Sequence, residues 1–481
     1  MKKFKRFLGA GLTAVLALSA TACSTGNGGA TSTPDKEYDS VVELAVLEAG
    51  YGKVPYQKLA EAYMERNPGV LVKLRFDPQI NSNVETQVNN NNNVADIYCI
   101  RETSQIFNFA LAGKVVNLNT MLDSTYGAGY AEADKTVRSN VQAQAIEATS
   151  LGGNCYAIPE YTSITGFVYN VSLFEKKGWK VPTNNKELKE LCETIMADPD
   201  GIAPIAYCGA AADGYLYHAI DNWLFQYAGI SNLDAIHKYD NAELFAPESE
   251  VSVGKKLAHE ALKEFLKDMK DGGYAKDGSM ALKHIATQEA IVEGKIAMMP
   301  NGTWVENEIS DILSQYPDVD LGMFPIPEMV DVSGEVVHAP SYTTVDNKRV
   351  LDASYGAYYF VPSNCDNVEG AVDFLKFINS DEGSVIYTKN SNAVRPLDYN
   401  LDSTTSDYAT MKKFGKTILD IAHSCYLYAP VETSSLALTG AMRLYPKNSY
   451  WCKDLLMNWQ TFSIDDHLQA DYDYAVATLN R

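Results

Sequence analysis

Carboxylates, arginines and aromatic rings gather in this sequence where predicted strands end and loops begin. Candidate ligand-binding side chains of these types are Glu48, Tyr51, Arg101, Glu102, Glu160, Tyr161, Asp213, Tyr215, Trp223, Trp304 and Arg395. Charged side chains make charge-assisted hydrogen bonds with hydroxyl groups, and flat rings cover C–H surfaces. We therefore expect these residues to form a ligand-binding site, because loops at strand ends commonly carry binding residues.

Each of these residues also has a structural interpretation. Tyrosine and tryptophan fill cores as readily as binding sites, and the neighbours Leu224 and Phe225 favour a core position for Trp223. Arg395, which precedes Pro396, could donate to a ligand or form a salt bridge between parts of the fold. For the loop carboxylates, a solvated surface position is the corresponding alternative.

Motifs for covalent or metal-dependent catalysis are missing from the sequence. His259-Glu260 has no second histidine four residues after the first, which excludes a zinc-protease helix. No Gly-x-Ser-x-Gly elbow or phosphate-binding loop occurs, and seven scattered histidines indicate no metal cluster. The Gly50-Tyr51-Gly52 turn imitates a dinucleotide site, but Pro55 replaces the third glycine. We expect no cofactor and no metal.

A carboxylate pair is the remaining enzymatic possibility. A secreted glycoside-active enzyme needs two carboxyl groups about 5 to 10 Å apart across the bond that is cleaved. Its candidates are Glu102, Glu160, Asp213 and Glu306. We favour a binding protein, because no catalytic motif accompanies these residues.

The N-terminus has the layout of an export signal. Four basic residues within residues 1–6 precede an apolar run from Phe7 to Ala20, which is too short to span a bilayer. The run ends in small residues at Cys23, an arrangement that resembles a lipoprotein signal. We expect residues 1–22 to be removed, Cys23 to carry the lipid, and residues 23–38 to form a flexible spacer. Simple secretion with an incidental Cys23 is the alternative.

Composition and charge describe a globular, acidic chain. About 440 residues follow the spacer, which is too many for one hydrophobic core and suits two or three domains. The formal net charge is −21, and it becomes −25 without the four basic residues of the leader. Such a surface repels nucleic acid and anionic lipid headgroups. Nucleic acid is therefore excluded as a partner.

Seven cysteines besides Cys23 show no repeating spacing: Cys99, Cys155, Cys192, Cys208, Cys365, Cys425 and Cys452. This odd number predicts no disulfide framework, and without a Cys-x-x-Cys pair a structural zinc site is not expected. We expect most of these cysteines to be buried small apolar residues, and one bridged pair is left open.

Strands and helices alternate along most of the chain. An apolar run at residues 41–47 is followed by a helix with Pro55 at its start and by a second strand at residues 70–76. This βαβ order predicts parallel strands. An apolar helix face at residues 257–269 later precedes a strand at 296–299. The alternation predicts an α/β fold up to about residue 380, and the tail after residue 410 is predicted to be mainly helical.

Four segments form a series with a recognisable order and spacing. They are Gly152-Gly153-Asn154-Cys155-Tyr156-Ala157-Ile158-Pro159 with the block at residues 166–183, Glu293-Gly294-Lys295-Ile296-Ala297-Met298-Met299-Pro300-Asn301-Gly302-Thr303-Trp304, Gly322-Met323-Phe324-Pro325-Ile326-Pro327, and the helical segment at residues 369–378. The series resembles the family of extracellular solute-binding proteins of bacterial ABC importers, which includes maltose-binding and multiple-sugar-binding lipoproteins. Behind a lipoprotein signal, four segments in register identify the chain as a member of this family.

The resemblance implies a periplasmic-binding-protein-like fold with two α/β lobes, a ligand cleft between them and a hinge that the chain crosses more than once. It places lobe one at residues 39–165 with 326–381, and lobe two at 166–325 with 382–481. It implies a monomeric lipoprotein that captures a mono- or oligosaccharide by lobe closure and delivers it to ABC permease subunits, with Trp304 against a sugar ring. A peptide, polyamine or nucleoside on the same fold is the alternative ligand.

Overall fold

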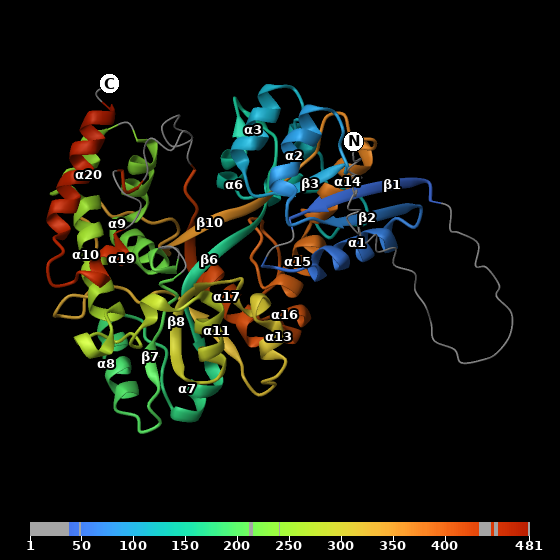
Figure 1. The fold of residues 1–481 in the computed structure, drawn as a ribbon. Coiled ribbons are helices and arrows are strands. Elements are labelled where there is room, and N and C mark those ends of the chain that lie inside the picture. The colour runs from blue at the N-terminus through green and yellow to red at the C-terminus, as the bar shows by residue number, and fades with distance from the viewer. Residues whose placement is uncertain are drawn as a thin grey trace, which may run out of the picture.

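The computed structural model describes residues 38–47, 50–210, 215–239, 241–431, 444–446 and 451–479. They form two α/β lobes joined by two long strands, β6 (Ile158–Asn170) and β10 (Arg349–Phe360) (Figure 1). The two strands pair antiparallel between the lobes. Because the chain crosses between the lobes on both strands, each lobe is assembled from segments that are distant in sequence.

One path of paired strands runs through both lobes. Its order is β2-β1-β3-β10-β6-β8-β7, with β11 beside β10 and β9 beside β6. Besides β6 and β10, the strands are β1 (Ser40–Val46), β2 (Val70–Phe76), β3 (Ile97–Ile100), β7 (Ala203–Ile205), β8 (Ile296–Gly302), β9 (Leu321–Phe324) and β11 (Cys425–Tyr428), and β4 (Ser150–Leu151) pairs separately with β5 (Asn154–Cys155). The parallel pairing of β1 with β2 and β3 confirms the βαβ prediction.

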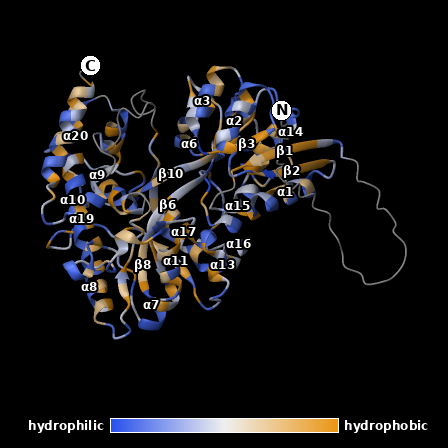
Figure 2. Ribbon diagram, in the orientation of Figure 1, coloured by the Kyte–Doolittle hydropathy of each residue, from blue (hydrophilic) through white to orange (hydrophobic). Residues whose placement is uncertain are grey.

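Helices cover the strands of the first lobe. They are α1 (Val54–Arg66), α2 (Ile80–Asn89), α3 (Thr103–Leu111), α4 (Asn119–Asp123), α5 (Val137–Asn140), α6 (Ala143–Ala148), α14 (Val368–Ile378) and α15 (Asp381–Ser391). Pro55 lies in the first turn of α1, where its missing amide is tolerated, and Leu59 and Tyr63 are buried. Figure 2 shows that β1 and β2 are largely hydrophobic, and β2 packs against α1 although it lies at the edge of the sheet.

The second lobe and the C-terminal region contain most of the remaining helices. These are α7 (Val171–Lys177), α8 (Asn185–Met196), α9 (Tyr217–Lys238), α10 (Glu250–Leu266), α11 (His284–Val292), α12 (Val305–Glu308), α13 (Ser310–Leu313), α16 (Ser406–Thr410), α17 (Lys413–Ser424), α19 (Cys452–Met457) and α20 (Ile464–Leu479), with short 3₁₀ turns at Ala242–Phe245, Met269–Asp271 and Ser279–Ala281. The predicted apolar face of α10 is buried through Ala258, Leu262 and Phe265. The described tail is mainly helical, as predicted, although it also contributes β11.

Two segments pack with the lobe opposite to the one predicted. Ile326, Met329 and Ala339 belong to the core of the second lobe. Tyr387 and Ala393 belong to the core of the first lobe, where α15 packs against α1. We therefore propose that the lobes divide near residues 350 and 398 instead of at 326 and 382.

The seven cysteines that the structure describes are all free thiols. Six are buried and Cys365 is half-buried, so the bridged pair that the sequence left open does not occur among them. Burial raises the pKa of the Cys192 thiol, as expected for a small apolar core residue. Within the described part of the chain, no helix is both long and apolar enough to cross a membrane.

Candidate ligand-binding cleft

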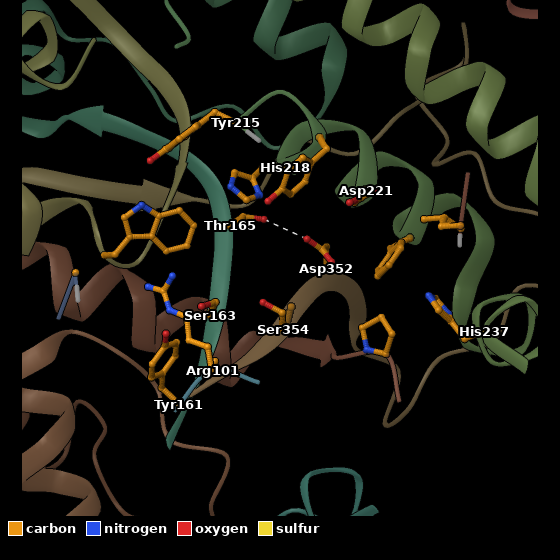
Figure 3. A pocket seen from close by; sticks show the side chains of 18 of the residues that line it. Arg101, Tyr161, Ser163, Thr165, Tyr215, His218, Asp221, His237, Asp352 and Ser354 are labelled. Atoms are coloured by element: carbon orange, nitrogen blue, oxygen red, sulfur yellow. Dashed lines mark hydrogen bonds between the residues drawn. The ribbon is translucent and has the colours of Figure 1, made fainter. Parts of the chain in front are cut away.

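A cleft of about 780 Å³ lies between the lobes (Figure 3). Its lining residues come from both lobes and from the crossing strands: Gly50, Tyr51, Arg101, Tyr161, Ser163, Thr165, Tyr215, Tyr217, His218, Asp221, Phe225, His237, Tyr239, Trp304, Glu308, Asp352, Ala353, Ser354, Gly356, Pro430, Leu444 and Tyr445. This volume is typical of a small-molecule site. A ligand held here touches both lobes at once.

The crossing strands form the floor of the cleft. Tyr161, Ser163 and Thr165 alternate along β6, so their side chains project from the same face of the strand. Ser163 lies opposite Ser354 of β10 in the antiparallel register. Side chains from both strands therefore present hydroxyl groups to the same space, as Figure 3 shows.

Trp304 forms a flat wall at the end of β8. Its ring covers Gly302, where a Cβ atom would lie 2.3 Å from the indole, so only glycine permits this close approach. Trp304 is half-buried and lines the cleft. The imidazole of His218 lies 5.5 Å from the indole, measured between ring centroids. One aromatic surface is thus fixed in place while part of it faces the ligand space.

Two tyrosines and an arginine extend the site into the first lobe. Tyr51 and Tyr161 meet edge to face at 4.5 Å between ring centroids. The hydroxyls of Tyr51 and Thr303 share a hydrogen bond of 2.7 Å, which links the lobes beside the cleft. Burial raises the pKa of Tyr51 to about 12, so its hydroxyl keeps its proton. Arg101 follows β3 and is exposed, so its guanidinium can donate to a ligand.

Two carboxyl groups lie farther along the cleft. Asp221 is buried on α9, and Asp352 is half-buried on β10. The Thr165 hydroxyl donates to the Asp352 carboxylate at 3.5 Å, and the Asp352 amide donates to the side-chain oxygen of Asn222 at 3.2 Å. Burial, followed by the negative charge of Asp221, raises the pKa of Asp352 well above its ordinary value. These carboxyls can accept hydrogen bonds from ligand hydroxyl or amino groups.

His218 offers a polar atom that the described residues do not satisfy. Its side chain is 7 % exposed, and its Nδ1 is buried without a hydrogen-bond partner among them. Burial lowers the pKa of His218 to about 3, so the imidazole is neutral at physiological pH. A neutral imidazole can donate from one nitrogen and accept at the other, which suits a ligand hydroxyl.

The structure brings five of the predicted site residues together in the cleft. They are Tyr51, Arg101, Tyr161, Tyr215 and Trp304. Glu102 is exposed at the start of α3 and does not line this cleft. Glu48, Asp213 and the proposed lipid-bearing Cys23 lie outside the described residues.

Trp223 lies in the core of the second lobe and not in the cleft. Its side chain is 0 % exposed, and its indole nitrogen donates to the Pro327 carbonyl at 3.0 Å. Its ring stacks on Phe265 at 6.1 Å between centroids. With the ring packed and its one donor satisfied, nothing of Trp223 is left for a ligand.

Glu160 and Arg395 form a buried network beneath the cleft. Glu160 precedes Tyr161, so its side chain projects from the opposite face of β6. There it accepts hydrogen bonds from Cys99 at 3.2 Å and from Tyr359 at 3.1 Å, and burial raises its pKa. Arg395 is 0 % exposed and donates to the Glu160 backbone carbonyl and to Asn379.

The three carboxylates nominated for catalysis that the structure describes do not meet in this cleft. Glu306 accepts a hydrogen bond from Asn392 at 2.7 Å and pairs with Lys412 at 3.5 Å. Of the three described nominees, none lines the cleft: Glu102 is exposed, and Glu160 and Glu306 are held in buried networks.

Several lining residues were not predicted from the sequence, among them Ser163, Thr165, His218, Asp221 and Asp352. Ser163 and Thr165 could have been found, because a strand that presents Tyr161 to a cleft must also present every second residue. The histidine and the two aspartates carry no local signal, since only the packing of α9 beside β10 brings them together.

Residues 49–385 match the sequence pattern of the family of bacterial extracellular solute-binding proteins. The chain belongs to this family. The family resemblance inferred from the four motif segments is therefore confirmed. So is the periplasmic-binding-protein-like fold with two α/β lobes.

Known proteins resemble this solute-binding protein over most of its length. The multiple sugar-binding protein of Streptococcus mutans serotype c is 23 % identical over 339 residues, which cover 68 % of this chain and 74 % of that protein. Unliganded RafE from Streptococcus pneumoniae superposes with a TM-score of 0.64 at 16 % identity, covering 93 % of this chain and 100 % of RafE. A probable secreted solute-binding lipoprotein from Streptomyces coelicolor gives 0.62 at 16 % identity, covering 92 % and 100 %.

Proposed function

We propose that this solute-binding protein captures a mono- or oligosaccharide between its lobes. The observation that carries the proposal is the half-buried face of Trp304 beside neutral hydrogen-bonding groups from both lobes. Pyranose rings need this combination, because their C–H faces stack on aromatic rings and their hydroxyls need donors and acceptors. The kinship with a multiple sugar-binding protein, and the fold shared with RafE, which has been solved with raffinose, support the same class of ligand.

Lobe closure supplies the mechanism of capture. Arg101 follows β3 of the first lobe, whereas Trp304 follows β8 and His218 lies on α9 of the second lobe. The Trp304 ring also packs against the core of the first lobe. A ligand that contacts both sides only in the closed form shifts the population towards closure. A few charge-assisted hydrogen bonds of about 1.5 to 3 kcal/mol each and one stacked ring suffice for micromolar affinity, about −8 kcal/mol.

We further propose that the protein is anchored outside the cell membrane through Cys23 and hands its cargo to ABC permease subunits. The apolar leader that ends in small residues before Cys23 motivates the anchor. Wild-type protein expressed with its leader should partition into membranes, and Cys23→Ala should be released into the medium. Wild-type protein that begins downstream of Cys23 would refute the anchor.

The cleft binds its ligand without cleaving it in this proposal. None of the three described carboxylates nominated for catalysis lines the cleft. Chromatography of the best ligand after incubation with the purified protein tests the point. Products that disappear with Glu160→Gln would move the protein into the enzyme class.

Asp221 and Asp352 favour a second candidate cargo, a cationic solute such as a polyamine. A thermal-shift screen of saccharides, peptides, nucleosides and polyamines decides between the classes, because a ligand of the folded state stabilises it by mass action. We expect neutral saccharides to raise the unfolding temperature most. Small-angle scattering should show contraction with the same ligand. A screen in which polyamines stabilise and saccharides do not would overturn the carbohydrate proposal.

A further inference from the structure

A lysine lies buried behind the wall of the cleft. Lys255 of α10 has 1 % of its side chain exposed, and its Nζ donates to the backbone carbonyl of Leu444. The same Nζ lies 4.6 Å from the centroid of the Tyr445 ring and 5.2 Å from that of Phe245. Lys255 forms an ion pair with Asp471 of α20, whose carboxylate oxygen lies 3.9 Å from Nζ.

Packing alone does not call for a charge at this position. Moving an ammonium group out of water is expensive, and an apolar side chain of similar volume often gives an equally or more stable protein. Burial lowers the pKa of Lys255 to about 8, although the negative charges of Asp471 and Asp221 act in the opposite direction. The fold thus retains a cation whose burial is unfavourable.

The partners of Lys255 show what the cation holds. Leu444 and Tyr445 line the cleft, and residues 444–446 belong to no helix or strand. The Tyr445 ring also meets Trp451 edge to face at 5.3 Å between centroids. Secondary structure does not hold this part of the wall in place. Lys255 holds it from the core instead, through cation–π attraction and a charge-assisted hydrogen bond.

We propose that Lys255 is a positioning residue for ligand binding, which holds Leu444 and Tyr445 in the geometry that completes the cleft. The inference rests on the proposed function, since it assigns a role in the binding of that ligand. Lys255 itself does not line the cleft. It acts through the two residues that do.

Among the described residues, four titratable groups act on Lys255 or lie close to it. His259 lies on the same helix, Asp221 on α9, Asp471 on α20, and Tyr445 on the wall. Burial lowers the pKa of His259 to about 4 and raises that of Tyr445 well above its ordinary value, so neither changes charge between pH 7 and 9. Protonated Lys255 is lost in this interval.

Lys255→Met tests the role, with Lys256→Met as the matched control. Lys256 is the next residue of α10 and also ties this helix to α20, through Asp465 at 2.7 Å, but its side chain is 42 % exposed. We expect Lys255→Met to bind its ligand about tenfold more weakly, the effect of about 1.4 kcal/mol, and Lys256→Met to bind normally. The probes are galactose, raffinose and the saccharide that stabilises the wild type most, titrated by calorimetry.

The unfolding temperature and the pH dependence of ligand affinity distinguish a positioning role from a merely structural role. Lys255→Met should unfold at the wild-type temperature or above, because it removes a buried charge. The folded-state pKa of Lys255 lies below its ordinary value of 10.5, so rising pH stabilises the wild-type fold from about 8 upwards. The same rise should weaken wild-type binding, whereas the affinity of Lys255→Met should lack this component between pH 7 and 9.

Hydrogen exchange of the unliganded protein gives a readout that needs no ligand. Peptides covering residues 444–446 should exchange faster in Lys255→Met than in Lys256→Met or the wild type. Should Lys255→Met not fold, Lys255→Gln keeps a donor for Leu444 without the charge and is measured instead. Wild-type affinity and wild-type exchange in the Lys255 variant would overturn the proposal. If no saccharide binds the wild type, the proposed function fails, while the exchange measurement still decides whether Lys255 holds the wall.

Discussion

Two pairs of like residues show how the cleft differs from the interior beneath it. Trp304 is half-buried at the end of β8 and faces the cleft, whereas Trp223 is enclosed on α9 and bonded to Pro327. Arg101 is exposed after β3, whereas Arg395 is buried and bonded to Glu160 and Asn379. In the interior, the indole nitrogen of Trp223 and both terminal guanidinium nitrogens of Arg395 donate to acceptors of the protein itself. In the cleft, rings and donors are held in place with part of their surface left for a ligand.

The largest effect in this comparison should come from Trp223→Ala. It leaves a cavity in the second-lobe core and removes the donor to the Pro327 carbonyl. We expect a loss of about 4 kcal/mol in the free energy of unfolding, measured by denaturant titration. Ligand affinity of the folded molecules should be unchanged. A stable Trp223→Ala protein with weakened binding would erase the distinction between the two tryptophans.

Arg395→Met should have the next largest effect. It removes a buried cation whose charge lowers the pKa of Glu160, and it leaves the Glu160 carbonyl and the Asn379 side chain without this donor. We expect a loss of about 3 kcal/mol in the free energy of unfolding. Because the Glu160 carboxyl is then harder to ionise, the loss should shrink as pH falls towards the raised pKa of that group. Unfolding curves at several pH values test both points.

Trp304→Ala should reverse the pattern seen for Trp223. Loss of the stacking surface should weaken ligand binding by about 2 kcal/mol, roughly thirtyfold. The free energy of unfolding should change less than the free energy of binding, because the ring is only half-buried. Calorimetric titration and denaturant unfolding of the same variant give both numbers. A badly destabilised variant that binds normally would place Trp304 with the core residues.

The smallest effect should come from Arg101→Ala. An exposed guanidinium adds one or two hydrogen bonds to a ligand, so affinity should fall by about 1 kcal/mol, roughly fivefold. Stability should not change, since the side chain has no packing to lose. Arg101→Lys provides the control, because it keeps the charge but loses the planar set of donors. An Arg101→Ala protein with unaltered affinity would remove this residue from the site.

The sequence predicted the architecture better than the site. The spacing of apolar residues predicted the βαβ unit, and the order of the motifs predicted the two-lobe fold. Both depend on local patterns along the chain. Local sequence patterns carry less information on where one lobe ends and the other begins. The boundaries that we propose rest on tertiary contacts, since Ile326, Met329 and Ala339 pack in the core of the second lobe and α15 packs on α1.

Residue type alone could not separate the cleft from the core. Leu224 and Phe225 favoured a core position for Trp223 but did not decide it, and the complete burial of its ring is seen only in the folded structure. Glu160 and Tyr161 are adjacent, yet the alternation of β6 sends one side chain into a buried network and the other into the cleft. Asp221 and Asp352 are 131 positions apart in the sequence, and no local pattern predicts that they lie near each other.

The shared strands β6 and β10 limit how the gene for such a protein can recombine. At Ile164 and Thr165, β6 changes partner from β10 to β8, so a single strand completes the sheet on both sides of the cleft. A crossover between genes that exchanges one contiguous half of the coding sequence would replace parts of both lobes and mismatch this strand. A single crossover therefore cannot exchange one lobe by itself, because each lobe is assembled from separate segments of the chain.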